Sequence, residues 1–228
     1  MTLSNVEWVD IKNYIIMTYQ PQDAFYRKAK KEGYRSRAAY KLLELGRRFH
    51  LIKPGERVVD LGAAPGGWLQ VAAELAGPRG KVVGIDLQPI APFHEPNIAL
   101  LQGDAASEEC GKKIEELLGG KADCVLSDLS PRLTGIHDAD IARSVELIRL
   151  AHAVARRLLR PGGNFLVKSF VAQELQAFFL ELKKDFSSVD RTRPEATRKG
   201  SSEIYFCARG YRGAGVEFRK TGFPLSRE

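Results

Sequence analysis

The chain has 228 residues, enough for one α/β domain with a core of its own, and its 44% hydrophobic and 28% charged residues are usual for a globular protein. It contains no run near the roughly 20 apolar residues that a membrane-spanning helix needs, and residues 1–20 lack the basic start and apolar block of a secretory signal. The three cysteines, Cys110, Cys124 and Cys207, form no CxxC pair, so we expect neither a disulfide framework nor a metal site. This use of cysteine fits a cytoplasmic protein best.

Positive charge is in excess and unevenly placed. The 35 Lys and Arg residues outnumber the 28 Asp and Glu residues, which gives a net charge of +7, and many of them fall in segments 27–48 and 191–220. Two basic segments suggest a polyanionic partner such as RNA. A solvated helix face explains a run of like charge equally well, and arginines of the first segment can also be structural, pairing with acids such as Glu44.

Strand-like and helical patterns alternate after residue 56. Apolar runs predict seven strands: Arg57–Leu61, Lys81–Asp86, Ile98–Gln102, Ala122–Ser127, Gly163–Lys168, Ser188–Arg191 and Glu203–Ala208. Helical patterns fill the gaps at about 67–76, 107–118, 138–160 and 173–185. This order favours a mostly parallel sheet with helices on both faces, and the last two strands predict a hairpin that adds an antiparallel edge strand. We expect this domain to span 23–210, after an ambiguous N-terminal extension at 1–22 and before a C-terminal tail at 211–228.

The segment VVDLGAAPGGW at 58–68 runs from a strand through small residues into a helix. Such a loop presents bare backbone N–H groups and a helix N-terminus to a ligand, and only Gly and Ala let a ligand come that close to the main chain. The segment differs from G-x-G-x-x-G, which points away from a dinucleotide and toward a smaller nucleoside-type cofactor. A tight turn without a ligand is the alternative. The positions that we expect to line the cofactor are Gly62, Ala63, Pro65, Gly66 and Gly67.

Acidic residues follow three of the predicted strands: Asp86, Asp104 and Asp128. Ligands of an open α/β sheet bind outside the carboxyl ends of its strands. Asp86, with Leu87 beside it, is placed to accept hydrogen bonds from ribose hydroxyls, and Asp104 is placed to accept one from an adenine amine. Each acid alone is typical of a loop or a cap. Their recurrence favours S-adenosylmethionine, which has a ribose and an adenine but no phosphate.

Two lysines and a glutamate complete a candidate catalytic cluster. Lys168 ends the strand-like run NFLVK, Glu203 begins the last strand, and Lys41 lies on a predicted helix in the first basic segment. A strand-end lysine can simply extend to water. Together with Asp128, however, these residues form a coherent set for aligning a hydroxyl group and removing its proton, a task that needs no metal.

The segments RSRAAYKLLEL, VVDLGAAPGGW, LQGD, LSDLSP, PGGNFLVKSF and SSEIYFCA, in this order over about residues 23–210, resemble the FtsJ/RrmJ (RlmE) family of ribosomal RNA 2′-O-ribose methyltransferases. The resemblance implies a Rossmann-like fold of the class I S-adenosylmethionine-dependent methyltransferases, with a seven-stranded sheet. The catalytic set that it implies is Lys41, Asp128, Lys168 and Glu203, with Lys168 as the proton acceptor. The cofactor positions that it implies are Gly66, Trp68, Asp86, Asp104 and Asp128. The implied substrate is a uridine of ribosomal RNA within the large ribosomal subunit.

We expect RNA to contact Arg35, Arg37, Arg132, Arg198 and Lys199, and the protein to act as a monomer. Two departures from the family pattern touch the rim where the target nucleotide should lie: Arg132 stands where Asn is usual, and SFVAQEL replaces a Gly-rich stretch after Lys168. Alternative functions are a methyltransferase for transfer RNA or a messenger RNA cap, and a non-catalytic RNA-binding factor for ribosome assembly. An NAD-dependent dehydrogenase would share the fold, but the missing G-x-G-x-x-G counts against it.

Overall fold

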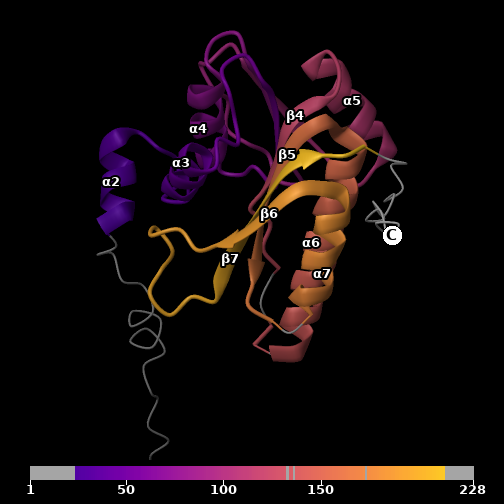
Figure 1. The fold of residues 1–228 in the computed structure, drawn as a ribbon. Helices are drawn as coiled ribbons and strands as arrows, with labels where there is room; N and C mark the ends of the chain where they lie inside the picture. Colours follow the sequence, from indigo (N-terminus) through magenta and orange to yellow (C-terminus); the bar gives the residue numbers. More distant parts are fainter. Residues whose placement is uncertain (1–23, 132–133, 136, 173, 214–228) are drawn as a thin grey trace, which may run out of the picture.

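The computed structural model describes residues 24–131, 134–135, 137–172 and 174–213, which form one seven-stranded sheet between two layers of helices (Figure 1). The strands are β1 (Arg57–Leu61), β2 (Lys81–Asp86), β3 (Ile98–Gln102), β4 (Ala122–Ser127), β5 (Leu159–Phe170), β6 (Phe186–Thr192) and β7 (Glu203–Tyr211). The helices are α2 (Ala24–Glu32), α3 (Ala39–Arg48), α4 (Gly67–Ala76), α5 (Glu108–Leu118), α6 (His137–Leu158) and α7 (Leu175–Asp185). The predicted extension at 1–22 lies outside the described residues, as do residues 214–228 of the tail predicted at 211–228, whereas Tyr211 is the last residue of β7.

The strands lie in the order β3-β2-β1-β4-β5-β7-β6. The first five pair in parallel, as predicted, and β7 is the antiparallel strand. It pairs with β5 on one side and with β6 on the other, which confirms the hairpin predicted for the last two strands and leaves β6 at the very edge. Because β7 runs against its neighbours, its first residue, Glu203, lies at the end of the sheet where the parallel strands finish. We call this end the carboxyl edge.

Each face of the sheet carries its own hydrophobic core. Helices α5, α6 and α7 cover one face, and α3 and α4 cover the other (Figure 1). Successive residues of β5 alternate between the two cores: Phe165 and Val167 pack on the α6 side, and Leu166 packs on the α3 side. The inner strands are therefore buried on both faces, which explains why their sequences are mainly apolar, whereas the edge strands β3 and β6 are only partly buried.

The junction of α6 and β5 differs from the prediction. The helix ends at Leu158 and the strand begins at Leu159, before the predicted start at Gly163. The register between β4 and β5 shifts over the following residues, where Gly162 has a φ of +82°, so this part of β5 is irregular. Although α6 has 22 residues, neither it nor any other described helix is both long and apolar enough to cross a membrane.

Candidate active site

The carboxyl edge brings the four predicted catalytic residues together as two ion pairs. Lys168 Nζ donates a hydrogen bond of 2.7 Å to the backbone oxygen of Asp128 and lies 3.1 Å from Oδ1 of the same residue. Lys41 Nζ donates to Oε2 of Glu203 at 2.8 Å. Lys168 is 5% exposed and Lys41 is 7% exposed, so both ammonium groups are largely removed from water. A carboxylate partner is what makes the burial of each cation tolerable.

Tyr205 links the two ion pairs, and the sequence reasoning missed it. Its hydroxyl donates to Oδ1 of Asp128 at 2.8 Å, and Lys41 Nζ lies 5.7 Å from the centre of its ring. Tyr205 pairs with Lys168 in the register of β5 and β7. Residues two apart on a strand share a face, so the spacing from Glu203 to Tyr205 in SEIYFCA is the signal that identifies this residue.

The ionisation states of the cluster follow from its contacts. Burial by itself raises the pKa of Glu203, but the hydrogen bond and charge of Lys41, together with the charge of Lys168, bring this pKa below its ordinary value. Burial and the charges of Asp128 and Glu203 raise the pKa of Tyr205 well above its ordinary value. At neutral pH, Glu203 is therefore a carboxylate and the Tyr205 hydroxyl keeps its proton.

The glycine-rich loop leaves β1 at the point where the strand order reverses, between β1 and β4. Asp86, at the end of β2, holds this loop. Its carboxylate accepts hydrogen bonds from the Ala64 N–H at 2.9 Å and from the Gln88 N–H at 2.8 Å. A carboxylate offers about four acceptor sites, so Asp86 retains the capacity to accept bonds from a ligand's hydroxyls.

The first N–H groups of the loop are already bonded within the protein, contrary to the expectation that they would be bare. Gly62 N and Ala63 N both donate to the carbonyl oxygen of Ile85, at 2.9 and 3.2 Å. The N-terminus of α4, which begins at Gly67, remains as the source of N–H groups, because the first N–H groups of a helix have no partner within it. The part of the loop that suits a ligand is therefore its helical end.

Two glycines of the loop are required by the packing of the protein itself. Gly66 has a φ of +108°, and a Cβ there would lie only 2.5 Å from the Phe93 ring. A Cβ on Gly67 would overlap Oγ of Ser36. Glycine at these two positions is therefore needed so that Phe93 and Ser36 can pack against the loop, whether or not a ligand is bound.

The other predicted cofactor residues differ in their surroundings. Trp68 is 3% exposed, and its indole N–H donates to the carbonyl oxygen of Ala38 at 2.8 Å, which fastens α4 to the start of α3. Asp104 is exposed beyond β3, and its Oδ1 accepts from the Ala106 N–H at 2.9 Å. Leu87 is 68% exposed. Trp68 therefore shapes the site by packing, whereas Asp104 and Leu87 stand at the surface.

Asp60 is a further acid near the loop. It is 1% exposed, and its Oδ2 has no hydrogen-bond partner among the described residues. Burial, together with the charges of Asp128 and Asp86, raises its pKa well above the ordinary value. An unpaired buried carboxyl group is costly, and here it marks a place where a donor or a cation would be favourable. Within the part of the chain that the structure describes, no three His, Cys, Asp or Glu side chains are grouped so as to hold a metal ion.

Three of the predicted RNA contacts lie together beside the ion pairs. Arg37, Arg198 and Lys199 line one pocket with Lys41 and Glu203, which we call the basic pocket. Burial and the nearby charge of Arg198 lower the pKa of Arg37. Positive groups crowded in this way favour an anion between them. The two basic segments of the sequence therefore meet at the carboxyl edge.

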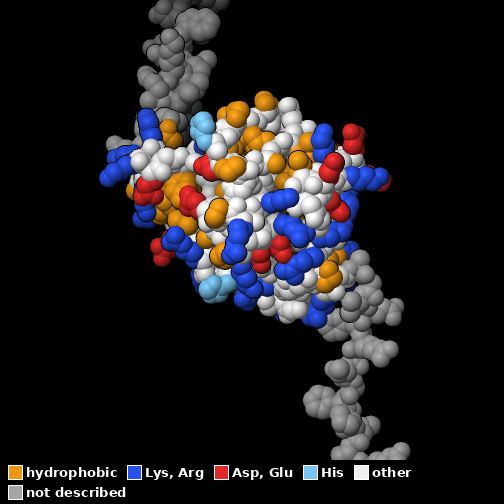
Figure 2. Space-filling model, turned by 90° about the horizontal axis from the view of Figure 1, so that it is seen from above, with side chains coloured by type: hydrophobic (Ala, Val, Ile, Leu, Met, Phe, Trp, Pro, Cys, Tyr) orange, Lys and Arg blue, Asp and Glu red, His pale blue; other side chains and the backbone are white. Residues whose placement is uncertain are grey.

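Positive charge is not confined to the basic pocket. Lys and Arg side chains also gather over part of the surface seen from above the view of Figure 1 (Figure 2). Charge by itself therefore does not identify an RNA-binding surface on this molecule, and proximity to the ion pairs is the more specific feature. Arg132, the remaining predicted contact near the target nucleotide, lies outside the described residues.

Arg35 has the structural surroundings that the sequence left open as an alternative. Its side chain donates to the carbonyl oxygens of Ala91 at 2.6 Å and Pro65 at 3.4 Å, and its guanidinium carbon lies 3.5 Å from the centre of the Phe93 ring. Its partners are thus carbonyl groups and an aromatic ring rather than Glu44. Arg35 fastens the glycine-rich loop to the segment after β2.

Comparisons with known proteins identify the family of this chain. A family model described as FtsJ-like methyltransferase matches residues 34–211. The chain is 53% identical over 189 residues to ribosomal RNA large subunit methyltransferase E of Methanothrix thermoacetophila, covering 83% of this chain and 72% of that protein. It is 48% identical over 192 residues to the protein of the same name from Methanothermobacter thermautotrophicus, covering 84% and 91%. A crystal structure of a Plasmodium falciparum protein described as a ribosomal RNA methyltransferase has a TM-score of 0.71 and 30% identity, covering 79% of this chain and 100% of that one. The chain belongs to the FtsJ-like methyltransferase family.

Proposed function

We propose that this protein transfers a methyl group from S-adenosylmethionine to a ribose 2′-hydroxyl of RNA, at a uridine of large-subunit ribosomal RNA. The observation that carries the proposal is the buried Lys168 ammonium group, held by the backbone and side chain of Asp128 at the carboxyl edge. The relatives' name, ribosomal RNA large subunit methyltransferase E, supports this choice of substrate.

The residues around the glycine-rich loop suit this cofactor. The carboxylates of Asp86 and Asp104 would accept hydrogen bonds from the ribose hydroxyls and the adenine amine. The carboxylates of Asp86 and Asp128 place negative charge at this end of the sheet, which favours a ligand with ammonium and sulfonium cations, and Oδ2 of Asp60, unpartnered among the described residues, is free to accept a hydrogen bond. When bound, S-adenosylmethionine supplies a methyl group that its sulfonium has already activated.

The remaining task of the protein is to manage one proton on the acceptor hydroxyl. In its neutral form Lys168 accepts this proton, and in its charged form it orients a lone pair of the hydroxyl oxygen. Asp128 and Tyr205 fix the position of the Lys168 side chain through their shared contacts. Lys41 and Glu203 hold the adjoining side of the site as an ion pair. A positioned proton acceptor typically contributes a factor of about 10²–10⁴ to a rate.

Mapping of 2′-O-methyl groups tests the proposal. Total RNA from cells with and without this protein is separated into ribosomal, transfer and messenger fractions, and each is mapped at nucleotide resolution. We expect one uridine of large-subunit ribosomal RNA to lose its methyl group and to regain it with the intact gene but not with the Lys168→Ala variant. A change confined to transfer RNA or caps would overturn the ribosomal substrate, and no change in any fraction would overturn the activity.

Asp86→Ala is expected to weaken the binding of S-adenosylmethionine. The variant removes a charge-assisted acceptor, which is typically worth about 1.5–3 kcal/mol. Isothermal titration calorimetry on the purified protein measures the effect. Asp86 also holds the Ala64 N–H, so Asp86→Asn, which keeps one acceptor oxygen, serves as the conservative control. Unchanged affinity in a folded Asp86→Ala protein would mean that the ribose is held elsewhere.

Neutralising the exposed rim of the basic pocket is expected to weaken RNA binding and to reduce its dependence on salt. The double variant Arg198→Gln/Lys199→Gln should reduce the magnitude of the slope of log K against log salt by roughly one to two. Each phosphate contact releases about one counterion on binding, and the variant has up to two fewer such contacts. The matched control is Lys112→Gln/Lys113→Gln, which removes the same charge from exposed positions on α5, at the other face of the sheet. Equal slopes in both double variants would show that only overall charge attracts RNA.

A further inference from the structure

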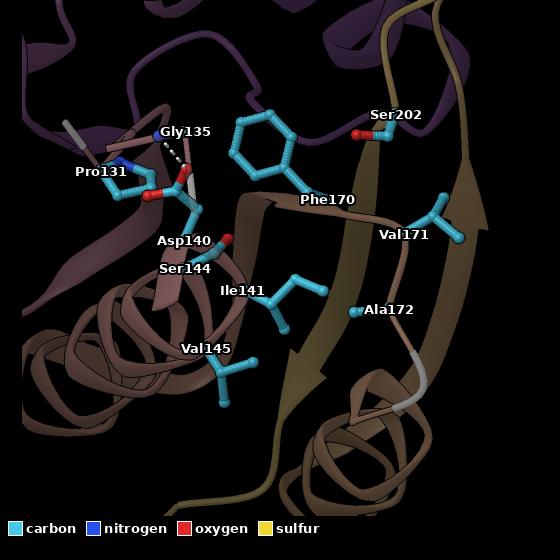
Figure 3. Close-up of a pocket in the computed structure, with 10 residues that line it drawn as sticks. All are labelled: Pro131, Gly135, Asp140, Ile141, Ser144, Val145, Phe170, Val171, Ala172 and Ser202. Atoms are coloured by element: carbon cyan, nitrogen blue, oxygen red, sulfur yellow. Dashed lines mark hydrogen bonds between the residues drawn. The ribbon is translucent and has the colours of Figure 1, made fainter. Parts of the chain in front are cut away.

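A pocket of about 260 Å³ opens beside the ion pairs, between the start of α6 and the residues that follow β5 (Figure 3). Its lining is mainly apolar and includes Ile141, Ser144, Val145, Phe170, Val171 and Ala172. The pocket is smaller than the roughly 300–1,000 Å³ of sites for drug-sized ligands, so it suits a flat fragment such as one nucleobase better than a whole nucleotide.

Phe170 belongs both to this pocket and to the active site. It lies two residues after Lys168 and is the last residue of β5, at the carboxyl edge. Lys168 Nζ is 5.9 Å from the centre of the Phe170 ring, and Phe170 pairs with Glu203 in the register of β5 and β7. An acceptor oxygen within about 3 Å of Lys168 Nζ would therefore bring its own nucleoside within reach of this ring.

The surface around Phe170 is apolar and partly exposed to water. Val171 is 61% exposed, and Figure 3 shows the Phe170 ring on one side of the pocket with Ile141 and Val145 of α6 on the other. Sequence-specific RNA recognition commonly stacks an unpaired base on an aromatic side chain. An apolar wall that adjoins the acceptor position has the chemistry to hold such a base.

The polar groups of the pocket differ in what they can still bind. The carboxylate of Asp140 accepts three hydrogen bonds, from the N–H and hydroxyl of Thr134, each at 2.8 Å, and from the Gly135 N–H at 3.1 Å. Asp140 is thus engaged in holding the loop before α6. Ser144 lines the pocket one helical turn further on, and its hydroxyl can both donate and accept, which suits the mixed donor and acceptor edge of a base.

We infer that Phe170 is the stacking platform for the base of the target nucleotide, and that the pocket beside it receives the edge of that base. This inference rests on the proposed RNA methylation and adds to it the part of the protein that holds the base. The ribose is presented to Lys168 while its base lies against the Phe170 ring. Removing the ring should therefore impair RNA turnover and leave the cofactor site unchanged.

The test is a cycle that combines a side-chain change with a base change. The substrate is a synthetic RNA that carries the mapped target, and its partner is the same RNA with an abasic ribonucleotide at that position, which keeps the 2′-hydroxyl. We expect Phe170→Ala to lower kcat/KM on the normal RNA by about 10- to 100-fold, the usual range for loss of one base–aromatic stack. The abasic RNA should lower kcat/KM of the unsubstituted enzyme by a similar factor, and the two changes together should cost little more than either alone.

Control variants separate stacking from folding. Phe170→Tyr keeps the ring and should retain near-normal turnover, and Phe170→Leu keeps an apolar side chain while removing the ring, which covers the case in which alanine disturbs the fold. Leu180→Ala, on an exposed apolar position of α7, should change nothing. Affinity for S-adenosylmethionine, measured by calorimetry, should be the same in all of these proteins.

The outcomes distinguish this inference from the proposed function. In one outcome, the unsubstituted enzyme methylates RNA while the fold-losses in kcat/KM from Phe170→Ala and from the abasic site multiply when the two changes are combined. In that case the ring does not act on the base, so the inference is wrong while the proposed function stands. If Phe170→Leu turns over RNA as fast as Phe170→Tyr, the ring is not needed, and again the inference is wrong while the proposed function stands. If the unsubstituted enzyme methylates neither this RNA nor large ribosomal subunits from cells that lack the protein, the proposed function is wrong and the inference is wrong with it.

Discussion

Replacing Lys168 by alanine is expected to lower the rate of methyl transfer by at least about 100-fold, the lower end of the usual contribution of a positioned proton acceptor. The Lys168 side chain is almost fully buried and contacts Asp128 at both its backbone oxygen and its carboxylate, so alanine removes the amine and both of these contacts. The measurement is the single-turnover rate of methyl transfer to the mapped RNA. Affinity for S-adenosylmethionine should stay within a few fold, because Lys168 acts on the hydroxyl and not on the adenosyl group.

Lys168→Arg separates the two roles that Lys168 can have. Arginine keeps the positive charge but does not give up its proton at any accessible pH, so it can orient a hydroxyl but cannot accept a proton from it. A Lys168→Arg enzyme as slow as Lys168→Ala supports proton transfer, and one with substantial activity supports orientation. Near-normal turnover of Lys168→Ala itself would remove this residue from the mechanism. Lys183→Ala, at an exposed position of α7, is the matched control.

Replacing Lys41 by methionine is expected to destabilise the protein by up to about 3–5 kcal/mol at neutral pH, the range for loss of one partner of a buried ion pair. Methionine keeps a long apolar stem but leaves the Glu203 carboxylate without its main partner. Urea unfolding at pH 7 measures the free energy of unfolding. The matched control is Lys112→Met, which breaks an exposed pair with Glu108 and should cost no more than about 1 kcal/mol.

The effect of Lys41→Met should also depend on pH in a definite direction. The pKa of Glu203 in the folded protein lies below its ordinary value, so its ion pair contributes stability above the unfolded-state pKa of about 4.3. This contribution is lost as the pH falls through the lower, folded-state pKa. In the variant, burial raises the pKa of Glu203, and the carboxyl group takes up a proton more readily. The difference in stability between the two proteins should therefore shrink from pH 7 toward pH 4, and a constant difference would show that Lys41 stabilises by packing alone.

The first four strands could be predicted from the sequence with the bounds that the structure has. Each is a short, mainly apolar run with a clear end, because its residues pack against the helices on both faces of the sheet. The meeting of Asp128 with Lys168 was predictable for a related reason, since parallel strands finish at the same edge of the sheet. The family resemblance implied that Lys41 and Glu203 belong to one site, but that they form an ion pair with each other is seen only in the structure.

The remaining features depend on contacts between segments that lie far apart in the chain. Nothing near Gly66 indicates that Phe93 would occupy the space above it, and nothing near Arg35 indicates its stacking on the same ring. The irregular start of β5 likewise arises from its register with β4. Strand periodicity could have placed Tyr205 on the same face as Glu203. Its hydrogen bond to Asp128, however, is seen only in the structure.

The position of β7 makes the site depend on the last strand of the domain. Lys41 and Glu203 are separated by 162 positions in sequence, and β7 enters between β5 and β6 instead of being added at the outside of the sheet. Pairings over such separations form late in folding, since they require long loops to close. A growing polypeptide therefore has neither Glu203 nor Tyr205 in place until nearly the whole domain has been synthesised. A chain truncated before β7 would lack both residues, and we expect it to be inactive in methyl transfer.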